Sequence, residues 1–258
     1  MRAARALLTP HGRRKARASL VEGRRLVEEA LRQGAVLERC FYRDEAVDAT
    51  LLRALKQAGC QLHPVAHRVL RTLSETATPQ GVVAVVRRRP WSLESLLEAP
   101  EPFVLVLDGI QEPGNVGTLL RAGWASAVSG AVFFPGTADP YQTKALRASA
   151  GALFRLPHLW APEPEALLQT LQGAGLSLWV AEAAQGPSPD QADLTGPGAL
   201  ILGSEARGAS PVSRRMARPL TIPMPGGAES LNVAMAGAIL LYERVRQQGR
   251  RRGATSGS

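Results

Sequence analysis

The chain has 258 residues, 45% of them hydrophobic, and a formal net charge of +9. This length can bury a full core and is close to the size at which a chain divides into two domains. No apolar run reaches the roughly 18 residues of a membrane-spanning helix, so we expect no membrane partner. The first ten residues are arginine-rich and lack a secretory apolar core. Both a transit peptide and a plain basic extension fit them, and we favour the extension and a cytoplasmic location.

The cysteines and histidines do not form a metal-binding pattern. Cys40 and Cys60 lack metal-ligand spacing and are expected to be core residues of a protein in a reducing cytosol. His63 and His67 are four residues apart, but the pattern provides neither a carboxylate nor a third ligand beside them. We therefore predict that the protein uses no metal and that these histidines lie on the surface.

Positive charge is concentrated in the N-terminal part of the chain. Residues 1–100 contain 18 Lys and Arg against 10 Asp and Glu, whereas residues 101–258 contain 13 against 12. This asymmetry favours a polyanion such as nucleic acid as the partner of the N-terminal part. A solvated basic surface without a partner is the alternative.

The N-terminal part is expected to form a basic arm over residues 1–18 and a compact α/β domain over residues 19–88. Apolar residues recur at helical spacing within residues 20–31, and Gly34 is the stop signal of that helix. Residues 89–102, rich in charge and proline, are the expected linker. The remaining elements alternate: a strand over 36–42, a helix over 47–58, a strand over 61–65, a short helix through Val69 and Leu73, a loop over 76–81 and a strand over 82–86.

The second domain is expected over residues 103–247, with a flexible polar tail over residues 248–258. Phe103–Leu107 is a continuous apolar run, typical of a strand that is buried on both faces. Further strands alternate with helices, which favours a mostly parallel sheet with helices on both faces. The strands are expected at 131–134, 177–180, 199–202 and 220–222, and the helices at 116–126, 143–149 and 163–171.

Three loops follow expected strand ends, which is where an open α/β sheet binds its ligand. The first is Asn115-Val-Gly-Thr-Leu-Leu-Arg121, and the second is Leu202-Gly-Ser-Glu-Ala-Arg-Gly208. If a helix begins near Val116, Arg121 lies about a turn and a half along it and can point back toward the strand edge. Each glycine alone is explained as a turn residue, but the three loops together favour a ligand site.

The third loop lies within residues 219–236 and is the stretch around which the second domain is organised. Its prolines and Gly226-Gly227 exclude a regular helix and leave backbone N–H and C=O groups partly free for a ligand. Ser230 is expected as the N-cap of a long helix from Leu231 to about Val245. Asn232 adds a second polar side chain at the start of this helix.

The three loops resemble, in order and spacing, the motifs of the SpoU/TrmH-type RNA ribose 2′-O-methyltransferases of the SPOUT superfamily. The motifs are Asn115-x-Gly117-x-x-x-Arg121, Gly203-Ser-Glu205-x-x-Gly208, and Ile222-Pro-Met224 followed by Ser230-Leu-Asn-Val-Ala234. Residues Leu20–Val27 and Thr78–Val83 are similar to the L30e-like substrate-binding domain that precedes the catalytic domain in the ribosomal-RNA members.

The resemblance implies a SPOUT catalytic domain whose C-terminal segment forms a trefoil knot, although true knots are nearly absent from proteins. It also implies that the methyl donor S-adenosylmethionine binds in a bent form, held largely by main-chain atoms. The family acts as a homodimer with the active site near the subunit interface, and the small residues at 234 and 236–238 suit close helix packing, between subunits or within the core. The residues carried over to the donor pocket are Gly203, Ser204, Ile222, Met224, Leu231, Asn232 and Ala234.

By the same resemblance, the catalytic residues are Arg121, Asn115, Glu205, Ser230 and Asn232. Arg121 matches the arginine that is proposed in the family to activate the 2′-hydroxyl. A guanidinium, with a pKa above about 12, is a poor base. Binding of the phosphate beside the ribose, or stabilisation of the developing alkoxide, is chemically easier. Without the family, an ion pair with Arg207 or Arg121 explains Glu205 equally well, and a helix cap explains Ser230.

The sequence therefore predicts an S-adenosylmethionine-dependent RNA ribose 2′-O-methyltransferase, with ribosomal RNA, 23S in particular, favoured by the two-domain layout. A transfer-RNA methyltransferase and a non-catalytic RNA-binding protein that retains the fold are the alternatives. A dinucleotide-binding or P-loop enzyme is disfavoured, because neither glycine-rich pattern follows the first strand of the second domain.

Overall fold

The computed structural model describes residues 1–75 and 79–255, and its contacts divide the chain into two compact units. Unit 1 contains residues 1–90 together with residues 139–155, and unit 2 contains residues 91–138 and the described residues from 156 on. The pattern of alternating elements placed all of residues 103–247 in one domain and did not indicate this excursion of the chain. No helix in the described ranges is long and apolar enough to cross a membrane.

Unit 1 is built on a four-stranded mixed sheet. Its strands are β1 (Ala18–Glu22), β2 (Leu37–Tyr42), β3 (Gln61–Pro64) and β4 (Val82–Arg87). Its helices are α1 (Arg2–Ala6), α2 (Pro10–Ala16), α3 (Arg24–Arg32), α4 (Ala49–Gln57), α5 (His67–Arg71), α8 (Thr143–Ser149) and α9 (Ala152–Arg155), with a 3₁₀ turn η1 (Asp44–Ala46).

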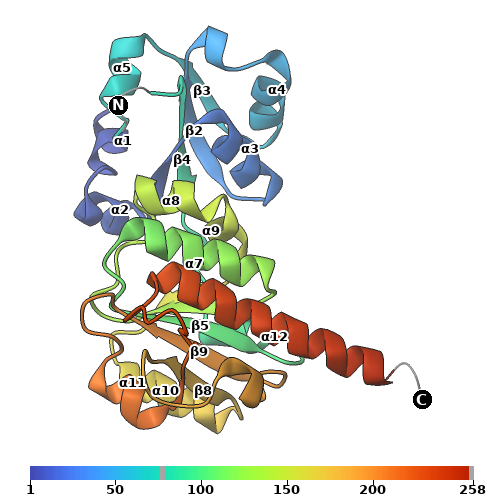
Figure 1. Cartoon of the computed structure of the whole chain (residues 1–258). Coiled ribbons are helices and arrows are strands. Elements are labelled where there is room, and N and C mark those ends of the chain that lie inside the picture. Colours follow the sequence, from blue (N-terminus) through green and yellow to red (C-terminus); the bar gives the residue numbers. More distant parts are fainter. Residues whose placement is uncertain (76–78, 256–258) are drawn as a thin grey trace. The chain divides into compact units, whose positions relative to one another are not determined.

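The sheet of unit 1 has the order β1-β4-β2-β3, with β4 antiparallel to both of its neighbours and β3 parallel to β2. Helices α1, α2 and α5 lie on one face of this sheet, and α3 and α4 lie on the other (Figure 1). Alternate residues of the strands, among them Leu20, Phe41 and Val83, form a buried cluster with α1 and α5. This follows from the two-residue side-chain period of a strand.

The N-terminus differs from the expected basic arm. Residues 2–16 form α1 and α2, and Ala4 and Leu7 are buried in the core of the unit. Arg13 is also buried: its Nη1 donates to the carbonyl oxygen of Leu7 at 3.2 Å, and its Nε lies 2.8 Å from Oδ2 of Asp139. This stretch has few apolar residues and many arginines. The sequence pattern therefore predicted a basic arm and gave no signal for the two helices.

The helix expected within residues 20–31 is shorter than predicted, because β1 occupies Ala18–Glu22 and α3 begins only at Arg24. Gly23 separates the two elements with a φ of +97°, a conformation that favours glycine. All five residues of β1 are buried, so its pattern lacks the alternation that marks an exposed strand. In the loop expected over 76–81, residues 76–78 lie outside the described residues, and so does Thr78 of the L30e-like match.

Unit 2 is a six-stranded sheet covered by helices on both faces. Its strands are β5 (Phe103–Asp108), β6 (Gly130–Phe133), β7 (His158–Trp160), β8 (Ser177–Ala181), β9 (Gly198–Gly203) and β10 (Arg218–Leu220). Its helices are α6 (Leu93–Leu97), α7 (Pro113–Ala125), α10 (Pro164–Gly173), α11 (Pro211–Met216) and α12 (Val233–Thr255), with a 3₁₀ turn η2 (Pro189–Gln191).

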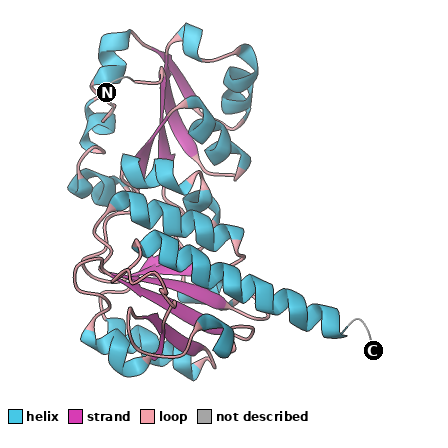
Figure 2. Cartoon of the chain, viewed as in Figure 1, coloured by secondary structure: helices cyan, strands magenta, loops and turns pink. Residues whose placement is uncertain are grey.

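The strand order is β10-β8-β9-β5-β6-β7, and the pairings of these described strands are all parallel. Helices α7 and α12 cover one face, and α10 and α11 cover the other (Figure 2, with labels in Figure 1). The chain moves outward from β5 to β7 and then crosses to β8 on the other side. The order therefore reverses between β5 and β9, which is where α/β folds of this type bind ligands.

Helix boundaries in unit 2 differ from the expected ones at three places. Helix α7 begins at Pro113, three residues before Val116, because Glu112 caps it by accepting the N–H of Asn115 at 2.8 Å. Helix α12 begins at Val233 and continues to Thr255, where a polar tail was expected. The expected linker contains the short helix α6, which buries Leu96.

Gly237 allows α12 to pack directly on its neighbours, because a Cβ there would lie 2.4 Å from Cδ2 of Leu119 and 2.6 Å from Cδ1 of Leu202. We expect Gly237→Ala to lower the free energy of unfolding by about 1–3 kcal/mol, the usual cost of overpacking a core. Gly249 lies on the same helix with open space around it, so Gly249→Ala should raise the free energy of unfolding by ~0.5–1 kcal/mol. Urea denaturation of the two variants measures both effects. Equal stabilities would contradict this account of the packing.

Candidate active site

The three loops singled out in the sequence meet at one edge of the six-stranded sheet. Because the strands are parallel, β5, β9 and β10 all end at the same edge. One polar side chain from each loop joins a hydrogen-bonded chain. Nδ2 of Asn232 donates to Oδ1 of Asn115 at 3.2 Å, and Nδ2 of Asn115 donates to Oε1 of Glu205 at 2.6 Å.

The start of α12 determines the orientation of this chain. Oδ1 of Asn232 accepts the N–H groups of Ala234 at 3.0 Å and Met235 at 3.3 Å, so Asn232 is the N-cap of the helix. Since its carbonyl oxygen is engaged, its amide NH₂ group faces Asn115. Asn115 then accepts with its oxygen and directs its own NH₂ group to the carboxylate of Glu205.

This geometry corrects the prediction that Ser230 caps the helix. Ser230 is exposed, two residues before Asn232, and its hydroxyl makes no hydrogen bond within the described ranges. Both residue types are good caps, so residue type alone did not distinguish them. Asn232 is capable of capping because its side chain reaches the second and third N–H groups of α12.

The second loop is a closed turn at the end of β9. The N–H of Ser204 donates to the carbonyl of Gly208 at 2.9 Å, and the N–H of Gly208 donates back to Ser204 at 2.8 Å. Gly208 has a φ of +68°, and a Cβ on Gly203 would lie 1.9 Å from the backbone nitrogen of Ala209. Both glycines are therefore required by the backbone of this loop.

Asp108 holds the segment that follows the second loop against the end of β5 and was not singled out by the sequence pattern. Its Oδ2 accepts the N–H of Ser210 and the hydroxyl of Ser213, each at 2.7 Å, and the residue is buried at the end of β5. A buried carboxylate requires such partners. The sequence signal that could have identified Asp108 is its position as an acidic residue directly after the apolar run Phe103–Leu107. Glu112, the cap of α7, has a similar positioning role.

The third loop and the start of α12 contribute apolar side chains that are partly or fully buried. Ile222, Met224 and Leu231 are half-buried, and Ala234 is 4% exposed. The N–H of Gly227 donates to the carbonyl of Met224 at 3.0 Å and closes a turn. Ser204, half-buried in the neighbouring loop, completes the set predicted for the donor pocket.

Arg121 does not join the Asn232–Asn115–Glu205 chain. It lies six residues beyond Asn115 on α7, about 9 Å along the helix axis and on a different face. Its side chain is exposed and makes no ion pair or hydrogen bond within the described part of the molecule. Glu205 therefore bonds with Asn115 rather than with Arg121 or Arg207.

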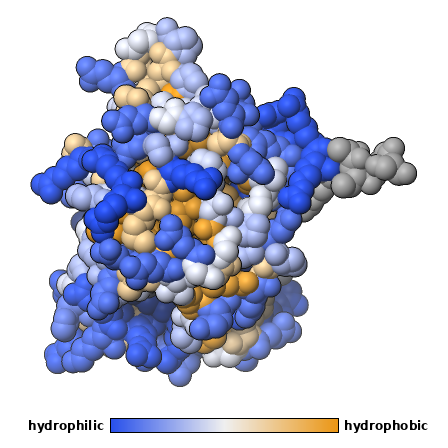
Figure 3. Space-filling model, turned by 90° about the horizontal axis from the view of Figure 1, so that it is seen from below, coloured by the Kyte–Doolittle hydropathy of each residue, from blue (hydrophilic) through white to orange (hydrophobic). Residues whose placement is uncertain are grey.

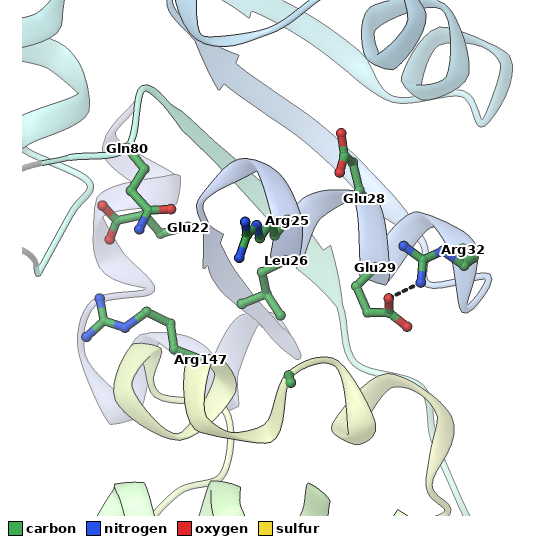
Figure 4. A pocket seen from close by; sticks show the side chains of 9 residues that line it. Glu22, Arg25, Leu26, Glu28, Glu29, Arg32, Gln80 and Arg147 are labelled. Carbon is green, nitrogen blue, oxygen red and sulfur yellow. Dashed lines mark hydrogen bonds and ion pairs between the residues drawn. The ribbon is translucent and has the colours of Figure 1, made fainter.

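A separate cleft of about 450 Å³ lies within unit 1, between α3 and α8 (Figure 4). Its lining includes Glu22, Arg25, Glu29, Gln80 and Arg147, and contains no residue predicted for the active site. Carboxylates and guanidinium groups alternate around it, and Glu29 pairs with Arg32. Its mixed charge does not suit a strongly anionic ligand.

The two cysteines are buried, and His63 and His67 contact neighbouring side chains. Burial raises the pKa of the Cys40 thiol to about 12 and that of Cys60 to about 11, so neither thiol is suited to nucleophilic chemistry. His63 stacks on Phe41, and His67 lies 3.0 Å from Nη1 of Arg43. The described residues contain no group of three or more His, Cys, Asp or Glu arranged to hold a metal ion.

An all-parallel sheet with polar loops gathered at its switch point defines a ligand-binding α/β domain, here preceded by a smaller mixed α/β unit. Residues 102–242 match the model of the SpoU rRNA Methylase family, and residues 1–84 match the MRM3-like substrate binding domain. The chain belongs to the SpoU rRNA methylase family, in agreement with the resemblance of its three motifs.

Curated relatives match most of the chain. The 23S rRNA (guanosine(2553)-2′-O)-methyltransferase RlmP of Bacillus subtilis (strain 168) is 32% identical over 92% of each chain. The mitochondrial rRNA methyltransferase 3 of Homo sapiens is 29% identical and covers 88% of this chain, with 67% of its own length matched.

Solved structures agree with this family. The SpoU methyltransferase AviRb from Streptomyces viridochromogenes, in complex with the cofactor AdoMet, superposes with a TM-score of 0.85 at 30% identity, covering 96% of this chain and 97% of its own. A solved structure described in connection with the 2-OH methylation of C/U34 on tRNA superposes with a TM-score of 0.50 at 26% identity. The match covers 58% of this chain and 97% of the other chain.

The cap of α12 provides a test of the site geometry. We expect Asn232→Ala to lower the free energy of unfolding by about 1 kcal/mol, because it removes the acceptor of two helix N–H groups. Ser230→Ala is the matched control and should change stability by less than about 0.5 kcal/mol, as exposed substitutions usually do. Urea denaturation compares the two. A larger loss of stability in Ser230→Ala than in Asn232→Ala would show that Ser230 is the N-cap.

Proposed function

We propose that this protein transfers the methyl group of S-adenosylmethionine to a ribose 2′-hydroxyl of 23S ribosomal RNA. The observation that carries the proposal is the hydrogen-bonded chain of Asn232, Asn115 and Glu205, which joins one residue from each family motif. Membership of the SpoU family supports it, as do relatives named for this reaction. The bacterial relatives that are named for 23S rRNA support a cytoplasmic location for this protein.

Ribosomal RNA is favoured over transfer RNA by the extent of the matches. The 23S rRNA enzyme of Bacillus subtilis aligns with 92% of this chain, whereas the tRNA-methylating neighbour covers 58%. We assign the RNA-binding role to residues 1–90, which contain the L30e-like domain of residues 19–88, and catalysis to residues 103–247. Guanosine is the first nucleotide to examine, because it occurs in the names of the Bacillus subtilis and Ralstonia nicotianae relatives.

A non-catalytic RNA-binding protein remains the second candidate, and the retained polar residues argue against it. Asn115 and Glu205, from two of the three motifs, make a hydrogen bond of 2.6 Å at the end of the sheet. Arg121, Ser230 and Asn232 are present and exposed at their motif positions. A protein that only bound RNA would not require this set.

The second and third loops fit S-adenosylmethionine, which supplies an electrophilic methyl group on a sulfonium when bound. Gly203 lets the loop after β9 close tightly, because a Cβ there would lie 1.9 Å from the backbone nitrogen of Ala209. Ile222, Met224 and Leu231 supply apolar edges for the flat adenine ring. We assign Ser204, Asn232 and Ala234 to the same pocket. A trefoil knot formed by the C-terminal segment is part of this proposal.

Orientation of the ribose falls to the side chains around the polar chain. Asn115 and Glu205 hold each other in place, so either can present a fixed acceptor or donor to a sugar hydroxyl. Ser230 is exposed two residues before Asn232, and its hydroxyl makes no hydrogen bond within the described residues, so it is available to substrate. These residues align the hydroxyl with the methyl group and exclude alternative geometries.

Arg121 acts as a cation in this mechanism. Its exposed guanidinium has no carboxylate partner in the described chain, which leaves its donors available for the phosphate beside the ribose. A guanidinium also stabilises the alkoxide that develops as the hydroxyl proton leaves. Removal of the proton by Arg121 itself would require a neutral guanidine, which proteins essentially never contain.

We expect Arg121→Ala to lower the single-turnover rate of methyl transfer by about 100-fold, while the affinity for S-adenosylmethionine stays within about threefold. Arg121→Lys keeps the charge and loses the planar fork, so it should retain measurable activity with little dependence on pH. If the residue served as the base, the lysine variant would regain activity steeply as pH approached about 10.4. Arg250→Ala, at an exposed arginine of α12, is the control. A parental rate in Arg121→Ala would remove Arg121 from the site.

A second copy of the chain is expected to cover the exposed apolar stripe of α12. Met235, Ile239, Tyr242 and Val245 are 59%, 41%, 67% and 39% exposed and recur at helical spacing. Apolar patches also interrupt the hydrophilic surface in Figure 3. A continuous apolar stripe on a soluble protein favours a protein interface, and a homodimer places that interface beside the start of α12 and hence beside the active site.

We expect the parent protein to sediment as a dimer and Ile239→Ser/Tyr242→Ser to sediment as a monomer, because the double variant removes the centre of the apolar stripe. Ala166→Ser/Gln169→Ser, at two exposed positions of α10, should leave the dimer intact. Sedimentation velocity at micromolar concentration distinguishes these outcomes. A monomeric parent, or a dimeric Ile239→Ser/Tyr242→Ser variant, would contradict the assignment.

A further inference from the structure

One face of unit 1 carries exposed cations that have no acidic partners. Residues 1–21 contain no Asp or Glu, and neither do residues 65–74, so α1, α2 and α5 are free of carboxylates. In the described part of the chain, none of the exposed basic side chains on these helices and their ends makes an ion pair or a side-chain hydrogen bond. They are Arg2, Arg5, Arg14, Lys15, Arg17, Arg68 and Arg71, and we call this surface the α1–α2–α5 face.

Contacts within unit 1 hold the helices of the α1–α2–α5 face in place. Ala4 and Leu7 of α1 share one buried cluster with Leu70 of α5 and with Leu73, which follows it. These apolar contacts hold the helices against one face of the sheet (Figure 1), and the basic side chains on them are exposed. Arg13 anchors α2 from beneath through its buried contacts with Leu7 and Asp139. The cations are thus presented on an ordered surface.

The opposite face of the same sheet has a different electrostatic character. On α3, Nε of Arg24 lies 2.7 Å from Glu28 and its Nη2 lies 2.5 Å from Asp48, while Arg32 pairs with Glu29. The cleft beside α3 is likewise lined by carboxylates as well as arginines (Figure 4). Phosphate groups would meet repulsion there as often as attraction.

We infer that the α1–α2–α5 face is the surface of unit 1 that docks RNA, through contacts to phosphate. The inference rests on the proposed function for the identity of the polyanion, and it adds which face binds it. Seven like charges on three short helices and their ends repel one another, and no ion pair within the described chain compensates them. RNA phosphates provide that compensation and release bound counterions when they bind. Contacts of this kind set position and orientation, and the active site is left to select the nucleotide.

Two matched triple variants test the inference in the full-length protein. Arg5→Gln/Arg14→Gln/Arg71→Gln removes one cation from each helix of the α1–α2–α5 face. Arg25→Gln/Arg53→Gln/Lys56→Gln removes the same charge from α3 and α4, at exposed residues without carboxylate partners in the described chain. Gln has nearly the helix propensity of Arg and Lys, so the fold should persist in both variants. Thermal melting and S-adenosylmethionine binding should match those of the parent.

The probe is unmodified 23S ribosomal RNA transcribed in vitro, measured by filter binding from 0.05 to 0.4 M salt. We expect the first variant to lose on the order of 100-fold in affinity at 0.1 M salt, with a slope of log K against log salt that is shallower by about 2. The second variant should stay within about threefold of the parent. Arg5→Lys/Arg14→Lys/Arg71→Lys keeps the charge and should restore most of the affinity.

Equal losses in both triple variants would overturn the inference, because net charge alone would then account for binding. A larger loss in the α3–α4 variant would assign docking to the opposite face, and unchanged affinity in both would place it outside unit 1. Failure of the proposed function is a different result: the parent protein would bind the transcript without methylating its ribose. Methyl transfer by the parent, measured in parallel, separates the two.

Discussion

The parallel pairing of β5 with β9 is the constraint on which the rest of the catalytic unit depends. Six residue pairs, from Phe103 with Gly198 to Asp108 with Gly203, place the ends of these strands side by side. Everything that follows each strand therefore starts from the same edge of the sheet. Asp108 then accepts from Ser210 and Ser213, and so holds the loop after β9 against the end of β5. A register shift would separate Asn115 from Glu205.

The start of α12 completes the site by a different kind of interaction. Asn232 is held by two backbone N–H groups of the helix, and its position depends on where the helix begins. Gly237 brings that helix close to Leu119 and Leu202, so packing on α7 and β9 sets the same boundary. The site thus depends on strand register, a helix cap and a close helix contact. Each of these features also stabilises the fold itself.

Much of the catalytic unit could be predicted from the sequence because its elements carry local signals. The apolar run at Phe103–Leu107 predicted a buried strand, and β5 covers it. The three motif loops were located, and the structure brings Asn115, Glu205 and Asn232 together. The excursion of residues 139–155 into unit 1 was not predicted, since a pattern of alternating elements does not tell which sheet a helix joins. Helices α1 and α2 were not predicted, because their apolar faces are short and the many arginines around them indicated a basic arm instead. The position of Arg121 away from the Asn115 chain was not predicted, because Asn115 was expected before the helix, whereas both residues lie within α7, six positions apart and on different faces.

The most direct test of the account is the chemical position of the transferred methyl group. Unmodified 23S ribosomal RNA would be incubated with the protein and S-adenosylmethionine carrying an isotopic methyl label, and then digested to nucleosides for mass spectrometry. The account predicts that the label appears in a 2′-O-methylated nucleoside, and that the adjacent phosphodiester resists alkaline cleavage because its 2′-hydroxyl is blocked. A label on a base, or no transfer by a protein that binds both the donor and the RNA, would contradict it.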